Sequence, residues 1–186
     1  MGLPVILCFC LSVIIYLPSE YIVSTGGFIM KKFKIIDLLI FIIATELVGA
    51  LSALFSGGGF AEYYNTLVKP PIAPPGGVFP IAWAILYALM GTACYLVYIS
   101  DREKKHLALK LYLLQLFVNF LWSPVFFGTK NFTAAAVIAV ILLITVTAAN
   151  FFFFKISDTA GALFLPYLLW SAYALYLTIG FLVLNR

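Results

Sequence analysis

Five long apolar runs, separated by short polar segments, make up most of the chain. Each run has about 20 residues or more, the length that an α-helix needs to cross the hydrocarbon core of a bilayer. The segments between them hold turn-forming residues and most of the charges. The pattern predicts membrane-spanning helices over residues 35–55, 78–100, 107–127, 132–154 and 159–184.

Composition supports the same class. Hydrophobic residues make up 65% of the chain and charged residues only 10%, proportions that are not typical of a soluble domain. The 186 residues leave no room for a separate soluble domain beside five spans. We therefore predict an all-α integral membrane protein, a bundle of five transmembrane helices with a proline-rich loop between the first and second.

The first 29 residues depart from this pattern. Residues 3–17 form an apolar run of 15, which is short for a span, and no basic residue precedes it to make a signal peptide. Met30 is followed by a lysine cluster and a full-length apolar run, a common start for a small membrane protein. Two interpretations stay open: residues 1–29 lie upstream of a true start at Met30, or they form an extra interfacial or signal-anchor segment. The membrane domain is predicted to cover residues 30–186.

A proline-rich segment precedes the second predicted helix. It has four prolines within residues 69–75, and proline fixes φ and removes a backbone donor. We therefore expect residues 69–77 to be a stiff, extended lid. Beyond it, four residues share one helical face at spacings i, i+4, i+7 and i+11: Trp83, Tyr87, Met90 and Cys94. A rigid lid above an aromatic face indicates a ligand site, although a plain turn above ordinary packing fits the spacing equally well.

Two further helices carry polar or aromatic faces. Amides inside a bilayer need hydrogen-bond partners, so we expect the face with amides to point into the bundle. In the third helix this face is Gln115, Asn119, Trp122 and Phe126. In the fifth helix the corresponding side is Pro166, Tyr167, Trp170, Ala174, Leu177 and Phe181. The fourth helix is nearly featureless, with Ala134–Ala136 as a packing surface.

Glu46 is the one ionisable residue in the middle of a predicted span. A charged group there costs a few kcal/mol, so it should face the bundle interior. A carboxyl that faces a ligand and an interhelical hydrogen bond are both compatible with this position. Gly49 and Ala53 add a small-xxx-small spacing that permits close helix contact, including contact in a dimer.

The basic residues predict the orientation of the five spans. Eight lie on the side of the first helix's N-terminus: Lys31, Lys32, Lys34, Arg102, Lys104, Lys105, Lys110 and Lys155. Three lie on the other side: Lys69, Lys130 and Arg186. In a bacterial cell membrane, residues 31–34 are therefore expected in the cytoplasm and the first loop outside.

The sequence carries no motif for an enzyme. The single histidine, His106, lies in a charged loop, which excludes a Ser-His-Asp triad and a multi-histidine metal site. The cysteines Cys8, Cys10 and Cys94 have no metal-binding spacing. We expect a binding protein with no catalytic residue, no metal, no required cofactor and no nucleic-acid partner. Its ligand should be flat and mostly apolar, and a tetrapyrrole would be held by aromatic packing without histidine ligation.

Three blocks of the sequence, in the same order, resemble the TspO/MBR family, which includes tryptophan-rich sensory proteins and the translocator protein or peripheral benzodiazepine receptor. The resemblance covers residues 30–186. The first block has Lys69-Pro70, Pro74-Pro75-Gly76, Val78-Phe79, Trp83 and Leu86 to Gly91. The second has Gln115, Asn119, Leu121 to Pro124 and Phe126 to Gly128, and the third has Pro166 to Trp170, Ala174 and Leu184-Asn185.

The resemblance implies a five-helix bundle, usually a homodimer, in a lipid bilayer. It also implies that porphyrins such as protoporphyrin IX and benzodiazepine-type ligands bind beneath the first loop. Carried over by position, the site residues are Tyr64 in the loop, Trp83 and Tyr87, then Asn119, Trp122 and Phe126, and finally Trp170 and Ala174.

The sequence departs from the family in three places. Ile72 and Gly77 stand where many members have tryptophan, and Thr178 stands where many have asparagine. A C-terminal cholesterol-recognition pattern is not formed because Tyr176 and Arg186 are too far apart, so cholesterol binding is not expected.

The favoured hypothesis is a membrane receptor, sensor or carrier for tetrapyrroles. The alternative from the enzyme class is light- and oxygen-dependent porphyrin breakdown, in which Trp83 and Trp170 would flank the ring. Two further hypotheses are a small-molecule transporter and a scaffold whose pocket is incidental.

Overall fold

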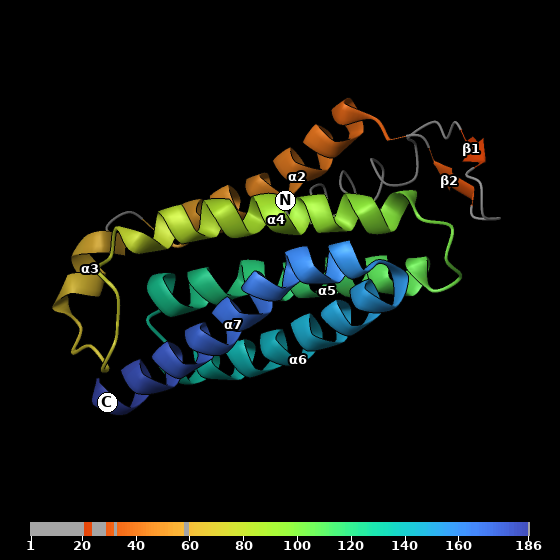
Figure 1. Cartoon of the computed structure of the whole chain (residues 1–186). Helices are drawn as coiled ribbons and strands as arrows, with labels where there is room; N and C mark the ends of the chain where they lie inside the picture. Colours follow the sequence, from red (N-terminus) through yellow and green to blue (C-terminus); the bar gives the residue numbers. More distant parts are fainter. Residues whose placement is uncertain (1–20, 24–28, 32, 58–59, 186) are drawn as a thin grey trace.

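Five long helices form the body of the protein, α2 (Ile35–Phe55), α4 (Val78–Ile99), α5 (Lys105–Ser123), α6 (Phe132–Ile156) and α7 (Asp158–Leu184) (Figure 1). This computed structural model describes residues 21–23, 29–31, 33–57 and 60–185. A π-helix, η1 (Pro124–Gly128), prolongs α5 by five residues. All five helices are long and apolar enough to cross a membrane. The prediction of a five-span integral membrane protein is confirmed, with every boundary within two residues.

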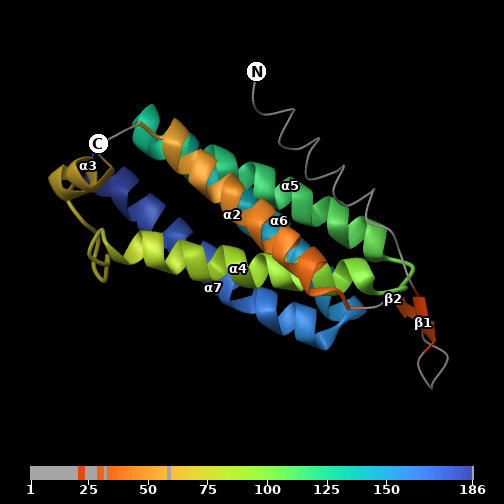
Figure 2. The same cartoon turned by 90° about the horizontal axis from the view of Figure 1, so that it is seen from above.

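The helices pack in a closed ring. α2 packs against α4, α4 against α7, α7 against α6 and α6 against α5. A contact between α5 and α2 closes the ring. Figure 2 shows α2, in orange, crossing the bundle between α4 and α5. At Gly91 the backbones of α2 and α4 lie close together, because a Cβ there would lie 2.7 Å from the Cα of Ile42. The absence of a side chain at Gly91 therefore sets the distance between these helices.

The predicted inner faces are confirmed, with one exception. Tyr87, Met90 and Cys94 are buried and Trp83 is half-buried, and the α5 face with its two amides is also inside. Large apolar side chains such as Leu39 and Ile43 point outward instead, as expected for a surface that meets lipid.

The exception is Pro166, which is exposed. Its neighbour Tyr167 is fully buried, and the step of about 100° between successive helical residues carries Pro166 out of the inner face. The prediction that Pro166 lines the interior is therefore wrong.

Polar side chains join the helices across the interior. The Tyr167 hydroxyl donates to Oε1 of Gln115 at 2.8 Å, linking α7 to α5. The hydroxyls of Thr45 and Tyr112 lie 2.7 Å apart and link α2 to α5. Asn150 on α6 was not singled out by the sequence pattern, yet it is only 3% exposed. Neither polar atom of its side chain has a hydrogen-bond partner in the described part of the chain.

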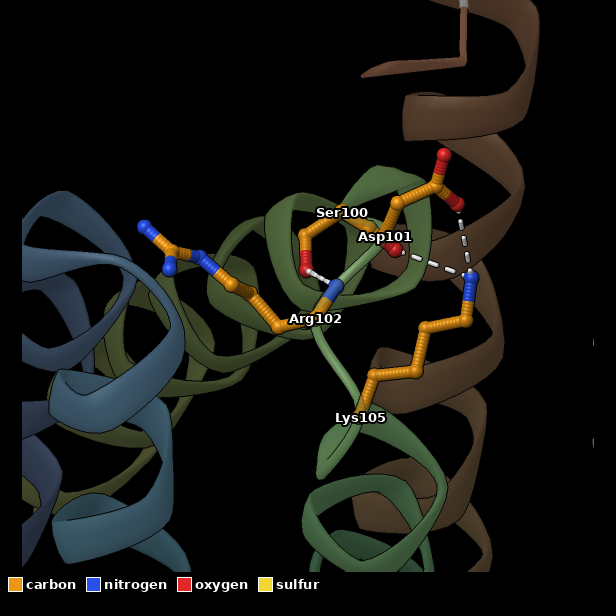
Figure 3. A network of polar contacts seen from close by, with 4 residues as sticks. All are labelled: Ser100, Asp101, Arg102 and Lys105. Carbon is orange, nitrogen blue, oxygen red and sulfur yellow. Dashed lines mark hydrogen bonds and ion pairs between the residues drawn. The ribbon is translucent and has the colours of Figure 1, made fainter. Parts of the chain in front are cut away.

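Short polar turns connect the helices. Figure 3 shows the turn between α4 and α5, where the Lys105 ammonium donates to the carbonyl of Ser100 at 2.9 Å and to Oδ1 of Asp101 at 3.4 Å. The Arg102 N–H donates to Oγ of Ser100 at 3.4 Å. An exposed ion pair of this kind adds little stability, so the segment acts as the solvated turn that was predicted.

The described residues before α2 include a small hairpin. Strands β1 (Tyr21–Val23) and β2 (Ile29–Lys31) pair antiparallel, with Tyr21 opposite Lys31. The apolar run at residues 3–17 lies outside the described residues, and both interpretations of it stay predictions.

The connection between α2 and α4, here residues 60–77, is more structured than an extended lid. It begins with a short helix, α3 (Phe60–Thr66), which was not predicted. Two turns follow, closed by hydrogen bonds from the Ala73 N–H to the Pro70 carbonyl at 3.2 Å and from the Val78 N–H to the Pro75 carbonyl at 3.0 Å. The expectation of an extended segment is wrong because the φ that proline fixes also suits the second position of a β-turn, where Pro71 lies in the first turn, and Gly76 and Gly77 form the centre of the second turn.

Candidate functional site

Two tyrosines of α7 fasten the connection over one end of the bundle. The Tyr173 hydroxyl donates to the carbonyl of Ile72 at 2.6 Å, and the Tyr176 hydroxyl donates to that of Pro71 at 2.8 Å. The backbone of Ile72 has a φ of 59°, which a β-branched residue rarely adopts. The hydrogen bonds from Tyr173 and Tyr176 therefore stabilise a turn conformation that Ile72 does not favour by itself.

The end of α7 provides a second attachment. Oδ1 of Asn185 accepts from the Val68 N–H at 2.8 Å, and its Nδ2 donates to the Val68 carbonyl at 3.0 Å. Nearby, a Cβ on Gly180 would lie 2.6 Å from Cβ of Pro70. The small residue lets the proline segment lie directly on α7, and both views show α3 and the end of α7 at the same end of the bundle (Figures 1 and 2).

Tyr64 anchors the connection from beneath. Its side chain is 1% exposed, and its hydroxyl donates to the carbonyl of Pro74 at 2.6 Å. Its ring meets Phe79 edge to face at a centroid distance of 5.3 Å, and the Lys69 ammonium lies 4.7 Å from the ring centroid. Burial, with a smaller effect from Tyr173, raises the pKa of the Tyr64 phenol. The hydroxyl therefore keeps its proton and stays a hydrogen-bond donor at neutral pH.

Six of the eight predicted site residues line a small cavity beneath the connection, here called the inner cavity. Its wall comes from the connection and from α4, α5, η1 and α7, and its volume is about 20 Å³. Ring contacts fill most of the space: Trp83 meets Trp170 at 6.4 Å between centroids, and Trp122 stacks on Phe126 at 5.0 Å. The six residues are Tyr64, Trp83, Trp122, Phe126, Trp170 and Ala174.

The other two predicted residues, Tyr87 and Asn119, line a larger cavity of about 290 Å³ between α2, α4 and α5, here called the outer chamber. The inner cavity and the outer chamber share four aromatic side chains as a common wall: Phe79, Trp83, Trp122 and Phe127. The eight residues thus lie close together but around two spaces. Sequence periodicity could not show this division because it depends on how side chains from different helices meet.

A hydrogen bond and a glycine position Tyr87. Nδ2 of Asn119 donates to the Tyr87 hydroxyl at 3.0 Å, and Trp83 stacks on the Tyr87 ring with centroids 5.3 Å apart. A Cβ on Gly49 would overlap that ring, so the glycine allows α2 to approach α4 here. The close contact expected from Gly49 thus occurs within one chain, while Ala53 is exposed at the outer chamber.

Several lining residues were not among the predicted site residues. Phe79 lies four residues before Trp83, so the same helical spacing could have identified it. Tyr173 lies three residues after Trp170 and reaches both the inner cavity and the connection. Phe127 belongs to the π-helical turn of η1, and no sequence pattern considered above predicts that turn.

Polar groups are few in this region. The indole N–H of Trp122 is buried, and it has no hydrogen-bond acceptor in the described part of the chain. Among the described residues, no group of three or more His, Cys, Asp or Glu side chains could hold a metal ion. The arrangement therefore offers ring surfaces and a few hydrogen-bonding groups to an apolar ligand.

Comparison with known proteins places the chain in a family. The model of the TspO/MBR family matches residues 41–184, which include both cavities and the connection. The chain belongs to the TspO/MBR family. The family resemblance seen in the three sequence blocks is thereby confirmed.

Three relatives in the TspO/MBR family illustrate its range. The tryptophan-rich sensory protein of Cereibacter sphaeroides is 40% identical over 124 residues, which cover 67% of this chain and 77% of the relative. Protein CrtK of Rhodobacter capsulatus is 32% identical over 137 residues, which cover 73% of this chain and 84% of the relative. The translocator protein of Bos taurus is 32% identical over 137 residues, which cover 72% of this chain and 81% of the relative.

Proposed function

We propose that this protein is a membrane receptor, sensor or carrier that binds a tetrapyrrole such as protoporphyrin IX at the inner cavity. The observation that carries the proposal is that all three tryptophans of the chain line this cavity: Trp83, Trp122 and Trp170. They come from three different helices and offer rings to a flat apolar ligand. Relatives named as a sensory protein and a translocator protein support the same proposal.

The inner cavity must open before it can hold such a ligand. A volume of about 20 Å³ is far below the roughly 300 Å³ or more of a typical ligand pocket. The connection is held against the end of α7 by hydrogen bonds to Tyr173, Tyr176 and Asn185, and each can break without unfolding a span. The proposed ligand access therefore includes release of the connection and movement of Trp170 and the other α7 side chains away from the aromatic wall that the two cavities share.

A titration of the purified protein with protoporphyrin IX in nanodiscs tests this function. Tryptophan fluorescence should fall saturably in the dark with the pigment intact, and the same sample should then be illuminated and analysed by mass spectrometry. A defined new tetrapyrrole product would favour the enzyme reading over the receptor. An absence of saturable quenching would overturn the proposal.

We propose in addition that the protein forms a homodimer whose connection lies outside the cell membrane. The family resemblance supports a homodimer, which chemical cross-linking in nanodiscs would trap as a single species of twice the monomer mass. Benzodiazepine-type ligands should compete with protoporphyrin IX if they use the same cavity. The excess of basic residues on one side supports placing the connection outside a bacterial cell membrane.

A further inference from the structure

The outer chamber contains a carboxyl group that the protein itself does not satisfy. Glu46 lies on α2, is half-buried and lines the chamber. It forms no hydrogen bond and no ion pair with any residue in the described part of the chain. No other Asp, Glu, Lys, Arg or His side chain lines this chamber.

The chamber is accessible from the lipid-facing side of the bundle. Its edge between α2 and α4 consists of small or short side chains that are exposed: Ala50, Ala53, Pro80 and Ala84. A molecule dissolved in the bilayer can reach this edge between the two helices without lifting the connection. Its volume, about 290 Å³, is near the lower end of the range for small-molecule pockets.

The chemistry of the chamber favours a cation. An ionised carboxyl at mid-membrane depth is costly unless a positive group pairs with it. The opposite wall offers the rings of Trp83 and Trp122, and aromatic faces attract cations. We propose that the outer chamber is a second binding site, which takes a lipophilic amine in its protonated form and pairs it with Glu46.

This site is separate from the proposed tetrapyrrole site. The aromatic wall shared by the two spaces, Phe79, Trp83, Trp122 and Phe127, stands between them. An amine paired with Glu46 lies on the α2 side of this wall, whereas Trp170 and Ala174 of the inner cavity lie on its α7 side. The two ligands should therefore bind together.

The test uses N-dansylethylenediamine, a lipophilic primary amine, and its N-acetylated neutral derivative as a matched probe. Energy transfer from tryptophan to dansyl is recorded in nanodiscs, with empty nanodiscs as the blank. The amine should bind saturably, and Glu46→Gln should weaken its binding about tenfold or more, because the negative charge that pairs with the ammonium is lost while a neutral hydrogen-bond acceptor remains. The same substitution should leave binding of the acetylated probe and of protoporphyrin IX unchanged.

Filling the chamber gives a test that does not depend on charge. Ala84→Leu should weaken binding of the amine. Ala162→Leu, at an exposed position of α7, should leave that binding unchanged. Equal binding of the amine by wild type and Glu46→Gln would overturn the proposal. Mutual exclusion of the amine and protoporphyrin IX would also overturn it, because the two spaces would then be one site. Loss of protoporphyrin binding with amine binding intact would refute only the tetrapyrrole function.

Discussion

Asn185 and Val68, 117 residues apart in the chain, are joined by two hydrogen bonds. Both bonds use the Asn185 amide, one to the N–H and one to the carbonyl of Val68. The pair ties the end of α7 to the start of the proline segment. Movement of the connection away from the inner cavity must break it.

Asn185→Ala should therefore loosen the connection. Two hydrogen bonds of about 0.5–1.5 kcal/mol each are lost, so we expect protoporphyrin IX to associate roughly tenfold faster. Stopped-flow quenching of tryptophan fluorescence measures the rate. Asn65→Ala is the matched control, since the Asn65 side chain accepts an exposed bond from Lys69 at 3.2 Å within the connection itself. Identical rates for the two variants would show that the connection does not limit access.

The double substitution Trp83→Phe and Trp170→Phe tests the inner cavity. We expect protoporphyrin affinity to fall by about 1–3 kcal/mol, because two large rings of the wall become smaller. The change in pigment absorbance measures affinity without relying on tryptophan fluorescence. Phe151→Leu alters an exposed ring of α6 and should have no effect. Unchanged affinity in the double variant would remove both tryptophans from the site.

Gly91→Ala should destabilise the packing of α2 on α4. The new methyl group would meet the backbone of Ile42 at 2.7 Å, and backbone cannot rotate away as a side chain can. Overpacking of this kind costs about 1–3 kcal/mol, which should lower the thermal midpoint in detergent. At Gly77 a Cβ would meet nothing within 4 Å, so Gly77→Ala serves as control. A midpoint equal to the control's would contradict the close crossing.

Tyr87→Phe should leave Nδ2 of Asn119 without its acceptor inside the membrane. An unsatisfied buried amide costs about 1–3 kcal/mol, measurable as a lower thermal midpoint. Replacing both partners, Tyr87→Phe with Asn119→Leu, should recover part of the loss. Tyr63→Phe changes a half-buried ring on α3 in the same way and should be neutral. A double variant worse than the single one would show that Asn119 has another role.

Cysteine labelling tests the orientation. In a background without the native cysteines, Ile72→Cys places a thiol on an exposed position of the connection, and Lys104→Cys places one at the opposite end of the bundle. A membrane-impermeant maleimide applied to intact bacterial cells should label the first and spare the second. The reverse result would invert the predicted topology.

Much of the site could be predicted from the sequence. The face of a helix on which a residue lies, and whether that face suits lipid, follow from the residues of that one helix. Asn119, Trp122 and Phe126 share a face whatever their neighbours are, and amides avoid lipid. Tyr64 was found only through its place in a family motif, since a seven-residue helix carries little periodic signal. The same rule that amides avoid lipid would have placed Asn150 inside, where it is found, so the description of the fourth helix as nearly featureless overlooked it.

By itself, the sequence determined the five spans, their inner faces and the family, because hydrophobic length and the 3.6-residue period depend only on local order. The tertiary structure decided the rest. It divided the eight residues between two cavities, closed the inner one with ring contacts, and tied Val68 to Asn185. These outcomes depend on how side chains from distant segments pack in three dimensions, and no single helix contains that information.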